Sequence, residues 1–463
     1  MTDHINIQID LATRELPYLT ILKTILENKF DLEISLLPQD PIWCNGTSSF
    51  FKTSKQKCDL LVTPSYNAKR TLNTLAWKHR SNSKLVHFHS EQLIDPRFYE
   101  EKLNTTCSLE YDRDVEYHLV WGEEFAKLLH EVAGVPKNRI YIVGCPKLSL
   151  IDRDKLVSRD TPNNKKVLFV SDFLWATMPQ NQYNWALKKY GIRPEDDFQG
   201  FYKTALDKFI ATAHQFSISN PDIDVVLRPH PGESQEAYRS LSELNNVEID
   251  IGTPFIESAV KADLIVQFLS TSFFESIYLG KPVICLDLVE QWGTHHRNYF
   301  KYYNFVKQKD FESTAKNYLD NSQSSYEVDD TCINELFSAD KGDSILRSAA
   351  ALSHILSISK NTFSTPILQD KIRSNNFILQ HMLKNVAGII STACISIGIK
   401  NTLLQRVKNA QLKWENSPEY FDSDTILQVT NRFLSSKYQN FDFKYHLTET
   451  KYGNLVEVQE QTH

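Results

Sequence analysis

The pattern of apolar and polar positions along the chain predicts an α/β protein. Residues 5–10 alternate apolar and polar side chains, as a strand does, and residues 16–28 repeat apolar side chains at helical spacing. Further short apolar runs follow at 32–37, 57–64, 84–89, 116–122 and 138–146. Helix-like stretches separate several of these runs. Strands that alternate with helices at this interval are typical of a parallel, doubly wound sheet.

The same alternation begins again after a polar segment at 151–164, which is the expected linker. A chain of 463 residues exceeds one ordinary hydrophobic core, so more than one domain is expected. We predict three parts: a Rossmann-like domain at 1–152, a second one at 165–345, and a mainly helical C-terminal extension at 346–463.

The most informative stretch of the second domain is residues 222–285. An apolar run at 225–227 leads directly into Arg228 and His230, which prolines flank. A second apolar run at 262–266 leads into three hydroxyl residues, Ser270, Thr271 and Ser272. Ligands of open parallel sheets bind beyond the carboxyl ends of the strands, where both loops would lie. Thr271 and Ser272 are expected to cap the following helix, whose free N–H groups suit a phosphate. The stretch therefore predicts a nucleotide or phosphate pocket.

Composition narrows the function classes. Charged residues make up 23% and apolar residues 41% of the chain, as in ordinary globular proteins. The net charge of −6 argues against a nucleic-acid partner. The seven cysteines form no CxxC pair, which fits a reducing compartment. Because the first residues lack the pattern of a signal peptide, a cytoplasmic location is expected.

The most apolar segment, residues 377–399, is as long as a bilayer span. Polar residues cluster in its first half, at Gln380, His381, Lys384 and Asn385. We therefore expect a helix that packs on the domains or lies on a membrane surface, rather than one that crosses the membrane.

Five short motifs carry a family resemblance. They are Arg14-Glu15, Val120-Trp-Gly122, Tyr141-Ile-Val-Gly-Cys-Pro146, Leu227-Arg-Pro-His-Pro231 with Glu233, and Ser270-Thr-Ser272 with Glu275. Together they resemble bacterial surface-carbohydrate (capsule or lipopolysaccharide) biosynthesis proteins of the GT-B glycosyltransferase type, relatives of the CMP-ulosonic-acid transferases. The chain departs from that pattern at Cys145, where Asn is usual, at Lys147, where Arg is usual, and at the Ser171-Asp172-Phe173 turn.

The resemblance implies a metal-independent glycosyltransferase whose two Rossmann-like domains face each other across a cleft. The N-terminal domain would bind a surface glycan or glycolipid acceptor, with peripheral contact at the cytoplasmic face of the inner membrane. The C-terminal domain would bind a nucleotide-sugar donor, and no other cofactor is expected. A CMP-linked donor with a Kdo-like sugar is preferred, because related transferases hold a cytidine nucleotide's phosphate with the His-Pro motif. UDP- and CDP-linked donors stay open.

The expected donor ligands lie in the two loops of the second domain. They are Arg228, His230, Ser270, Thr271, Ser272 and Glu275. His230, held rigidly between prolines, would contact the leaving phosphate or protonate it. Arg228 would contact the donor or pair with Glu233 or Asp224. Glu275 would accept hydrogen bonds from the ribose hydroxyls, as the resemblance implies.

The candidate catalytic carboxylates are Glu15 and Glu91, each of which follows a predicted strand of the first domain. Either would deprotonate the acceptor hydroxyl, or attack the sugar if configuration is retained. Arg14 would pair with Glu15 or recognise an acidic sugar or acceptor. His87 and His89 share one face of a strand, and buried, hydrogen-bonded imidazoles are expected there.

Two other readings stay open. A CDP-polyol phosphotransferase of the same fold would need His87 or His89 in the cleft, and a non-catalytic glycan-assembly subunit would bind without turnover. No metal site is assigned, because the adjacent His295 and His296 are poorly spaced to bind one ion and no carboxylate stands at suitable spacing.

Overall fold

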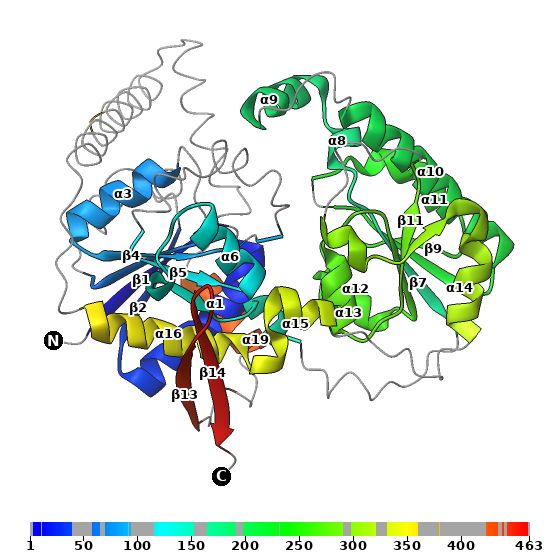
Figure 1. The fold of residues 1–463 in the computed structure, drawn as a ribbon. Coiled ribbons are helices and arrows are strands. Elements are labelled where there is room, and N and C mark those ends of the chain that lie inside the picture. The colour runs from blue at the N-terminus through cyan, green and yellow to red at the C-terminus, as the bar shows by residue number, and fades with distance from the viewer. Residues whose placement is uncertain are drawn as a thin grey trace. The chain divides into compact units, whose positions relative to one another are not determined.

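The computed structural model describes residues 3–10, 12–38, 58–64, 70–90, 92–93, 115–151, 164–190, 198–230, 232–289, 298–320, 331–359, 379, 423–433, 438 and 442–461. Their contacts divide the described chain into two compact units (Figure 1). The first unit combines the residues before 151 with those from 335 onward, and the second unit contains those between.

The first unit is built on an eight-stranded sheet with the order β13-β14-β6-β5-β4-β3-β1-β2. Every neighbouring pair is parallel except β13 and β14. The strands are β1 (His4–Ile9), β2 (Glu33–Pro38), β3 (Leu60–Thr63), β4 (Lys84–Phe88), β5 (Tyr117–Val120), β6 (Ile140–Ile142), β13 (Asp442–Glu449) and β14 (Asn454–Gln461).

Helices cover both faces of this sheet. The described helices are α1 (Ala12–Phe30), α3 (Arg70–Ser81), α6 (Glu123–Glu131), α7 (Pro146–Ser149), α16 (Ser344–Ser359) and α19 (Ser423–Phe433). A further helix, α15 (Thr331–Phe337), begins in the second unit and ends in the first. On β6, Tyr141 packs into the cluster with α1 and α16, whereas Ile140 and Ile142 pack with α6 on the opposite face. The alternating strand predicted at 5–10 is buried on both faces, so its polar residues Asn6 and Gln8 are buried as well.

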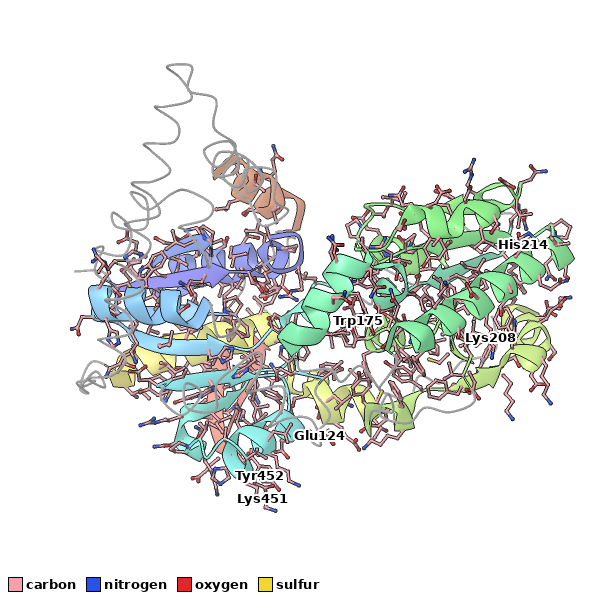
Figure 2. All side chains as sticks on the ribbon, turned by 90° about the horizontal axis from the view of Figure 1, so that it is seen from above. Glu124, Trp175, Lys208, His214, Lys451 and Tyr452 are labelled. Carbon is pink, nitrogen blue, oxygen red and sulfur yellow. The ribbon has the colours of Figure 1, made fainter. Side chains whose placement is uncertain are left out.

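The C-terminal residues belong to the first unit, where we had expected a separate, mainly helical extension. The β13–β14 hairpin extends the first sheet, because Asn454 and Leu455 of β14 pair in parallel with β6. Its turn lies beside α6, as the labelled Tyr452 and Glu124 show in Figure 2. The Lys127 ammonium of α6 lies 6.0 Å from the centre of the Tyr452 ring. The apolar segment 377–399 lies outside the described residues apart from Leu379. Among the described helices, none is long and apolar enough to cross a membrane.

A buried arginine of α16 joins this C-terminal hairpin to the rest of the unit. The Arg347 guanidinium donates hydrogen bonds to the carbonyl oxygens of Ser338 (2.7 Å), Ile142 (3.0 Å) and Val456 (2.5 Å). Burial lowers the pKa of Arg347 to about 10, so the side chain stays cationic at neutral pH. One side chain thus satisfies carbonyl groups that a buried strand edge would otherwise leave without donors.

The second unit contains a six-stranded parallel sheet with the order β12-β11-β10-β7-β8-β9. The strands are β7 (Lys166–Val170), β8 (Asp224–Arg228), β9 (Val247–Ile249), β10 (Leu264–Gln267), β11 (Val283–Asp287) and β12 (Phe305–Lys307). The described helices are α8 (Leu174–Thr177), α9 (Gln180–Tyr190), α10 (Phe198–Ser219), α11 (Arg239–Ser242), α12 (Phe255–Lys261), α13 (Ser272–Tyr278) and α14 (Phe311–Asp320).

Both sheets are of the doubly wound kind. In the second unit the chain proceeds from β7 to β8 and β9 on one side, and then to β10, β11 and β12 on the other. The expected fold class, α/β with two Rossmann-like units as in GT-B proteins, is therefore confirmed. The switch of direction lies between β7 and β10, and ligands of such sheets bind at the carboxyl ends of the strands beside that point.

Candidate functional site

The loops after β7, β8 and β10 of the second unit lie at this predicted binding edge. Since β7 pairs with both β8 and β10 in parallel, the three strands end side by side. Ser171 and Asp172 follow β7, His230 follows β8, and Ser270 follows β10. The structure thus brings both predicted loops to one edge and adds the turn after β7, which the sequence had marked only as a departure from the family pattern.

Glu233 fixes the loop that carries His230. Its carboxylate is buried and accepts hydrogen bonds from the Ser171 hydroxyl (2.5 Å), the Tyr238 hydroxyl (2.5 Å) and the Phe173 N–H. The Glu233 N–H in turn donates to the carbonyl oxygen of His230 (2.9 Å). Burial and the charge of Glu233 raise the pKa of Tyr238, so that hydroxyl stays a donor. The carboxylate therefore locks the β8 loop onto the turn after β7.

His230 presents one ring nitrogen to solvent. Its side chain is exposed, and Nδ1 accepts a hydrogen bond from the Gly232 N–H (3.2 Å). In a neutral imidazole only one nitrogen carries a proton, so this contact places the proton on Nε2. Nε2 is then a hydrogen-bond donor on an exposed side chain, which suits contact with a phosphate oxygen. Pro231, the second of the flanking prolines, lies outside the described residues.

Asp172 is the acidic neighbour of His230. Burial raises the pKa of the Asp172 carboxyl, His230 lowers it, and the negative charge of Glu233 raises it, with a net upward shift. Ionisable groups whose pKa is shifted by burial and by a charged neighbour cluster at functional sites, and the half-buried Asp172 is one of them. No sequence pattern marked Asp172 as a site residue, because its surroundings depend on the packing of the two loops.

Arg228 has a structural partner. Its Nη1 lies 3.1 Å from Oδ2 of Asp250, which follows β9, whereas the sequence had suggested Asp224 or Glu233 as its partner. Burial raises the pKa of Asp250, but hydrogen bonds from Ser258 and Thr253 and the charge of Arg228 outweigh it, and the pKa is lowered. The ion pair ties β8 to the segment after β9. Contact of Arg228 with a donor nucleotide stays a prediction.

The hydroxyl residues after β10 are arranged differently from our expectation. Thr271 occupies the N-cap position of α13 in a helical conformation and makes no capping hydrogen bond with its side chain. Instead, the Ser270 hydroxyl oxygen accepts the Ser272 N–H (3.3 Å), and the Ser272 hydroxyl donates to the buried Gln267 side chain (3.0 Å). Glu275 lies half-buried in the first turn of α13. Their roles as donor ligands stay predictions.

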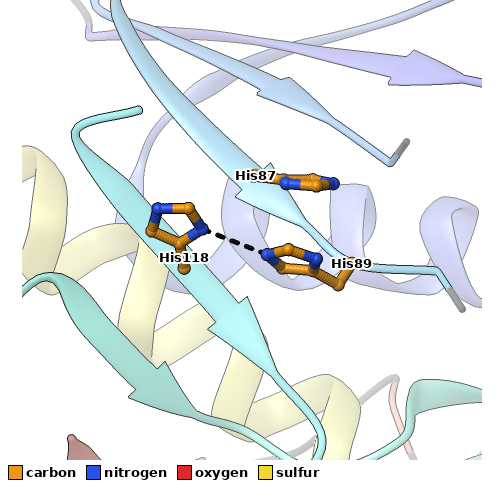
Figure 3. Close-up of side chains that lie close together, drawn as sticks. All are labelled: His87, His89 and His118. Carbon is orange, nitrogen blue, oxygen red and sulfur yellow. Dashed lines mark hydrogen bonds between the residues drawn. The ribbon is translucent and has the colours of Figure 1, made fainter. Parts of the chain in front are cut away.

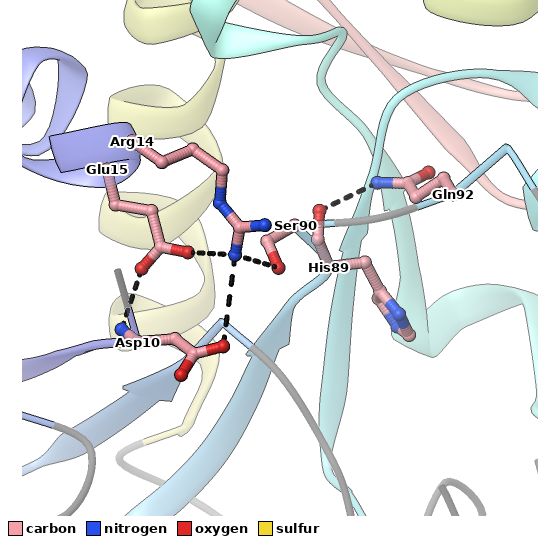
Figure 4. A network of polar contacts seen from close by, with 6 residues as sticks. All are labelled: Asp10, Arg14, Glu15, His89, Ser90 and Gln92. Atoms are coloured by element: carbon pink, nitrogen blue, oxygen red, sulfur yellow. Dashed lines mark hydrogen bonds and ion pairs between the residues drawn. The ribbon is translucent and has the colours of Figure 1, made fainter. Parts of the chain in front are cut away.

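A second polar network lies at the start of α1 in the first unit (Figure 4). Glu15 is fully buried, and its two oxygens accept hydrogen bonds from Arg14 Nη2 (2.7 Å) and from the Asp10 N–H (2.8 Å). Arg14 Nη2 also lies 3.3 Å from the Ser90 hydroxyl and 3.9 Å from Asp10 Oδ2. The expected Arg14–Glu15 pair is therefore present. These contacts favour a role for Glu15 in orienting Arg14, and its role as a base stays a prediction. Glu91 lies outside the described residues.

Three buried histidines lie beside this network (Figure 3). His87 and His89 come from β4 and the residue after its end, and His118 comes from β5. His89 Nε2 lies 3.1 Å from His118 Nδ1, which confirms the buried, hydrogen-bonded imidazole that we expected. Burial and the neighbouring imidazoles of His87 and His118 lower the pKa of His89 well below its usual value, so the imidazole is neutral. The sequence did not place His118 with the other two.

Comparison with known proteins gives a fold-level likeness. The chain matches no protein-family model and no curated protein. Solved structures similar to it include UDP-GlcNAc 2-epimerase from Neisseria meningitidis bound to UDP-GlcNAc (12% identity, TM-score 0.48, covering 77% of this chain and 100% of that one). Another is UDP-GlcNAc 2-epimerase from Methanocaldococcus jannaschii (14% identity, TM-score 0.48, covering 76% of this chain and 100% of that one).

The wall teichoic acid polymerase TagF is also similar (12% identity, TM-score 0.48, covering 78% of this chain and 90% of that one). At these identities the likeness concerns the fold alone. The site assignments therefore rest on the contacts described above.

Proposed function

We propose that this chain is a glycosyltransferase of GT-B type that takes a sugar from a nucleotide donor held at the carboxyl edge of the second sheet. The observation that supports this most directly is the convergence of the loops after β7, β8 and β10 at the switch point. Within that edge, His230 offers Nε2–H outward while Glu233 holds its loop in place.

The proposed role of His230 follows from its hydrogen bonding. With Nδ1 occupied by the Gly232 N–H, the neutral ring donates through Nε2, which would bind an oxygen of the donor's phosphate. As the sugar departs, negative charge grows on that phosphate, and a fixed donor stabilises it more than it stabilises the ground state. Asp172 lies close enough to interact electrostatically with His230 at this edge.

The remaining parts of the proposal come from the sequence. The donor would be a nucleotide sugar, with a CMP-linked, Kdo-like ulosonic acid preferred over UDP- and CDP-linked sugars because of the Arg-Pro-His-Pro motif at 228–231. Ser270, Thr271, Ser272 and Glu275 would complete its site. The acceptor would be a bacterial surface glycan or glycolipid, bound in the first unit near Arg14 and activated by Glu15 or Glu91. The enzyme would work in the cytoplasm or against the inner membrane.

The two alternatives receive less support. A polyol phosphotransferase needs a second catalytic-type histidine, but His87 and His89 are buried and face His118 within their own unit. A non-catalytic subunit would have no need for a buried carboxylate that positions an exposed imidazole. No observation on the described residues favours either reading specifically.

The test is a nucleotide-binding screen with CMP, CDP, UDP and GDP, read by thermal shift. A ligand present at a hundred times its dissociation constant stabilises the folded state by about 2.7 kcal/mol, which is readily measured. We expect stabilisation by a pyrimidine nucleotide in the wild type that is lost in His230→Ala. His214→Ala, on α10 of the same unit (Figure 2), is the matched control and should keep the shift.

The outcomes separate the readings. Selective stabilisation by CMP or CDP would support the cytidine-linked donor, and stabilisation by UDP would move the donor class to the UDP-sugars. If no nucleotide stabilises the wild type, or if His230→Ala binds as tightly as His214→Ala, the proposed pocket is wrong. A mass-spectrometric assay for sugar transfer or donor hydrolysis would then distinguish an enzyme from a binding subunit.

A further inference from the structure

The three buried histidines of the first unit form a compact cluster that the proposed function does not use. His87, His89 and His118 are 2%, 6% and 0% exposed. His87 pairs in register with His118 across the parallel strands β4 and β5, and His89 comes two residues later on the same face as His87. The topology of the sheet therefore places all three imidazoles at one point (Figure 3).

The rings converge more than the strand geometry requires. Residues two apart on a strand start about 6.6 Å apart at the backbone, because a strand rises about 3.3 Å per residue. The ring centroids of His87 and His89 are nevertheless only 3.5 Å apart, and those of His89 and His118 are 5.4 Å apart. One nitrogen from each of the three rings lies within 4.8 Å of the other two. Three possible ligand nitrogens thus lie close together.

This geometry is close to that of a metal site. Zinc–nitrogen bonds of about 2.0–2.1 Å place the ligand nitrogens of a tetrahedral site about 3.3 Å apart. His89 Nε2 and His118 Nδ1 are already 3.1 Å apart. That contact has a proton on one nitrogen and a lone pair on the other. A cation that takes the proton's place would be bound by both lone pairs once the donor imidazole carries its proton on the other ring nitrogen, so both rings stay neutral.

We propose that His87, His89 and His118 bind a divalent transition-metal ion of the zinc class. Imidazole nitrogen is a preferred ligand for zinc, copper, nickel and iron, and zinc is commonly bound in a tetrahedral site. Three histidines fill three of the four positions, and the fourth remains for water or a further ligand. The ion would link β4 to β5 immediately before Ser90, whose hydroxyl contacts Arg14. The proposal replaces our expectation that the protein has no metal site, and it is independent of the nucleotide site in the second unit.

The experiment uses the full chain, purified without a polyhistidine tag and freed of metal with a chelator. Zinc is added back at known free concentration, and bound metal is measured by elemental analysis after gel filtration. We expect about one zinc ion per chain in the wild type, a rise in Tm on zinc addition, and loss of both in His89→Gln and His118→Gln. His214→Gln, a histidine of the second unit, is the control and should bind as the wild type does.

A second measurement does not depend on whether the variants fold. X-ray absorption spectroscopy on zinc-loaded wild type should show three imidazole ligands to the metal. Fewer than three imidazoles would overturn the proposal, as would wild-type protein that binds no more zinc than His89→Gln. In that case the trio is a hydrogen-bonded part of the core. The nucleotide-induced thermal shift should be the same in wild type and His89→Gln, which separates this test from that of the proposed function.

Discussion

The Ser171 hydroxyl donates a hydrogen bond of 2.5 Å to the carboxylate of Glu233, 62 residues further along the chain. This contact joins the turn after β7 to the loop after β8. Because the Glu233 N–H also holds the carbonyl of His230, the position of the exposed imidazole depends on a carboxylate that need not touch a ligand itself.

Glu233→Gln should destabilise the second unit and weaken nucleotide binding. A glutamine keeps the shape of the side chain, but its NH₂ group cannot accept the hydrogen bonds that one carboxylate oxygen now accepts. Leaving a buried donor unpaired costs about 1–3 kcal/mol. Urea denaturation measures this decrease in the free energy of unfolding. Glu236→Gln, an exposed residue on the same loop paired only with Arg239, is the matched control, and equal midpoints for the two variants would contradict the prediction.

Arg347→Met should destabilise the first unit and release the C-terminal hairpin. The substitution keeps an apolar stem but removes the donors for three buried carbonyl groups, at Ser338, Ile142 and Val456. At about 1 kcal/mol or more for each group, we expect a loss of about 3 kcal/mol.

Hydrogen exchange measures this effect at individual amides, because those of β14 and β6 should exchange faster in Arg347→Met than in the wild type. Arg239→Met removes an exposed arginine of the second unit and should change neither exchange nor stability. Unchanged protection of β14 in Arg347→Met would show that the strand pairing alone holds the hairpin.

Asp172→Asn should stabilise the protein at neutral pH. The pKa of Asp172 is raised in the folded state, so this carboxyl contributes its full stability below pH 3.8, its usual value, and loses it as pH rises through the folded pKa. Asparagine does not ionise and avoids that loss. The stability difference between variant and wild type should therefore grow as pH rises from about 4 toward neutrality.

Thermal or urea denaturation at several pH values tests this, with the exposed Asp222→Asn as control. A pH-independent stability difference would mean that Asp172 ionises in the folded state as it does in the unfolded chain.

Gly144→Ala should be far more damaging than Gly252→Ala. Both glycines have a φ of +84°, a conformation that costs other residues about 1–2 kcal/mol. A Cβ at Gly144 would lie 2.2 Å from the Ser344 hydroxyl and 3.0 Å from Arg347, whereas a Cβ at Gly252 meets nothing within 4 Å. Differential scanning calorimetry of the two variants separates the cost of the backbone conformation from that of the crowding. If both variants lose the same amount of thermal stability, α16 must shift freely away from the turn at Gly144.

The agreement between the sequence predictions and the structure differs from element to element. The strands β1 to β8, β10 and β11 follow from hydrophobic periodicity, because a parallel sheet needs apolar runs of strand length, whereas the short strand β9 was not predicted. The β13–β14 hairpin was missed although its strands alternate polar and apolar residues, because the strand that it joins, β6, lies about three hundred residues earlier in the chain. The Arg228–Asp250 pair was misassigned for the same reason: the sequence shows charged neighbours along the chain, and β9 brings in a distant one.

The amino-acid sequence by itself determined the two parallel sheets and the loops in which His230 and Ser270–Ser272 lie, because periodicity and strand ends are local properties. Only the tertiary structure decided which side chains meet. It placed Asp172 and Glu233 behind His230, gave both oxygens of Glu15 partners, and brought His118 to His87 and His89. These contacts depend on strand order and register, which arise when distant segments bury their apolar faces together, and no short stretch of sequence records them.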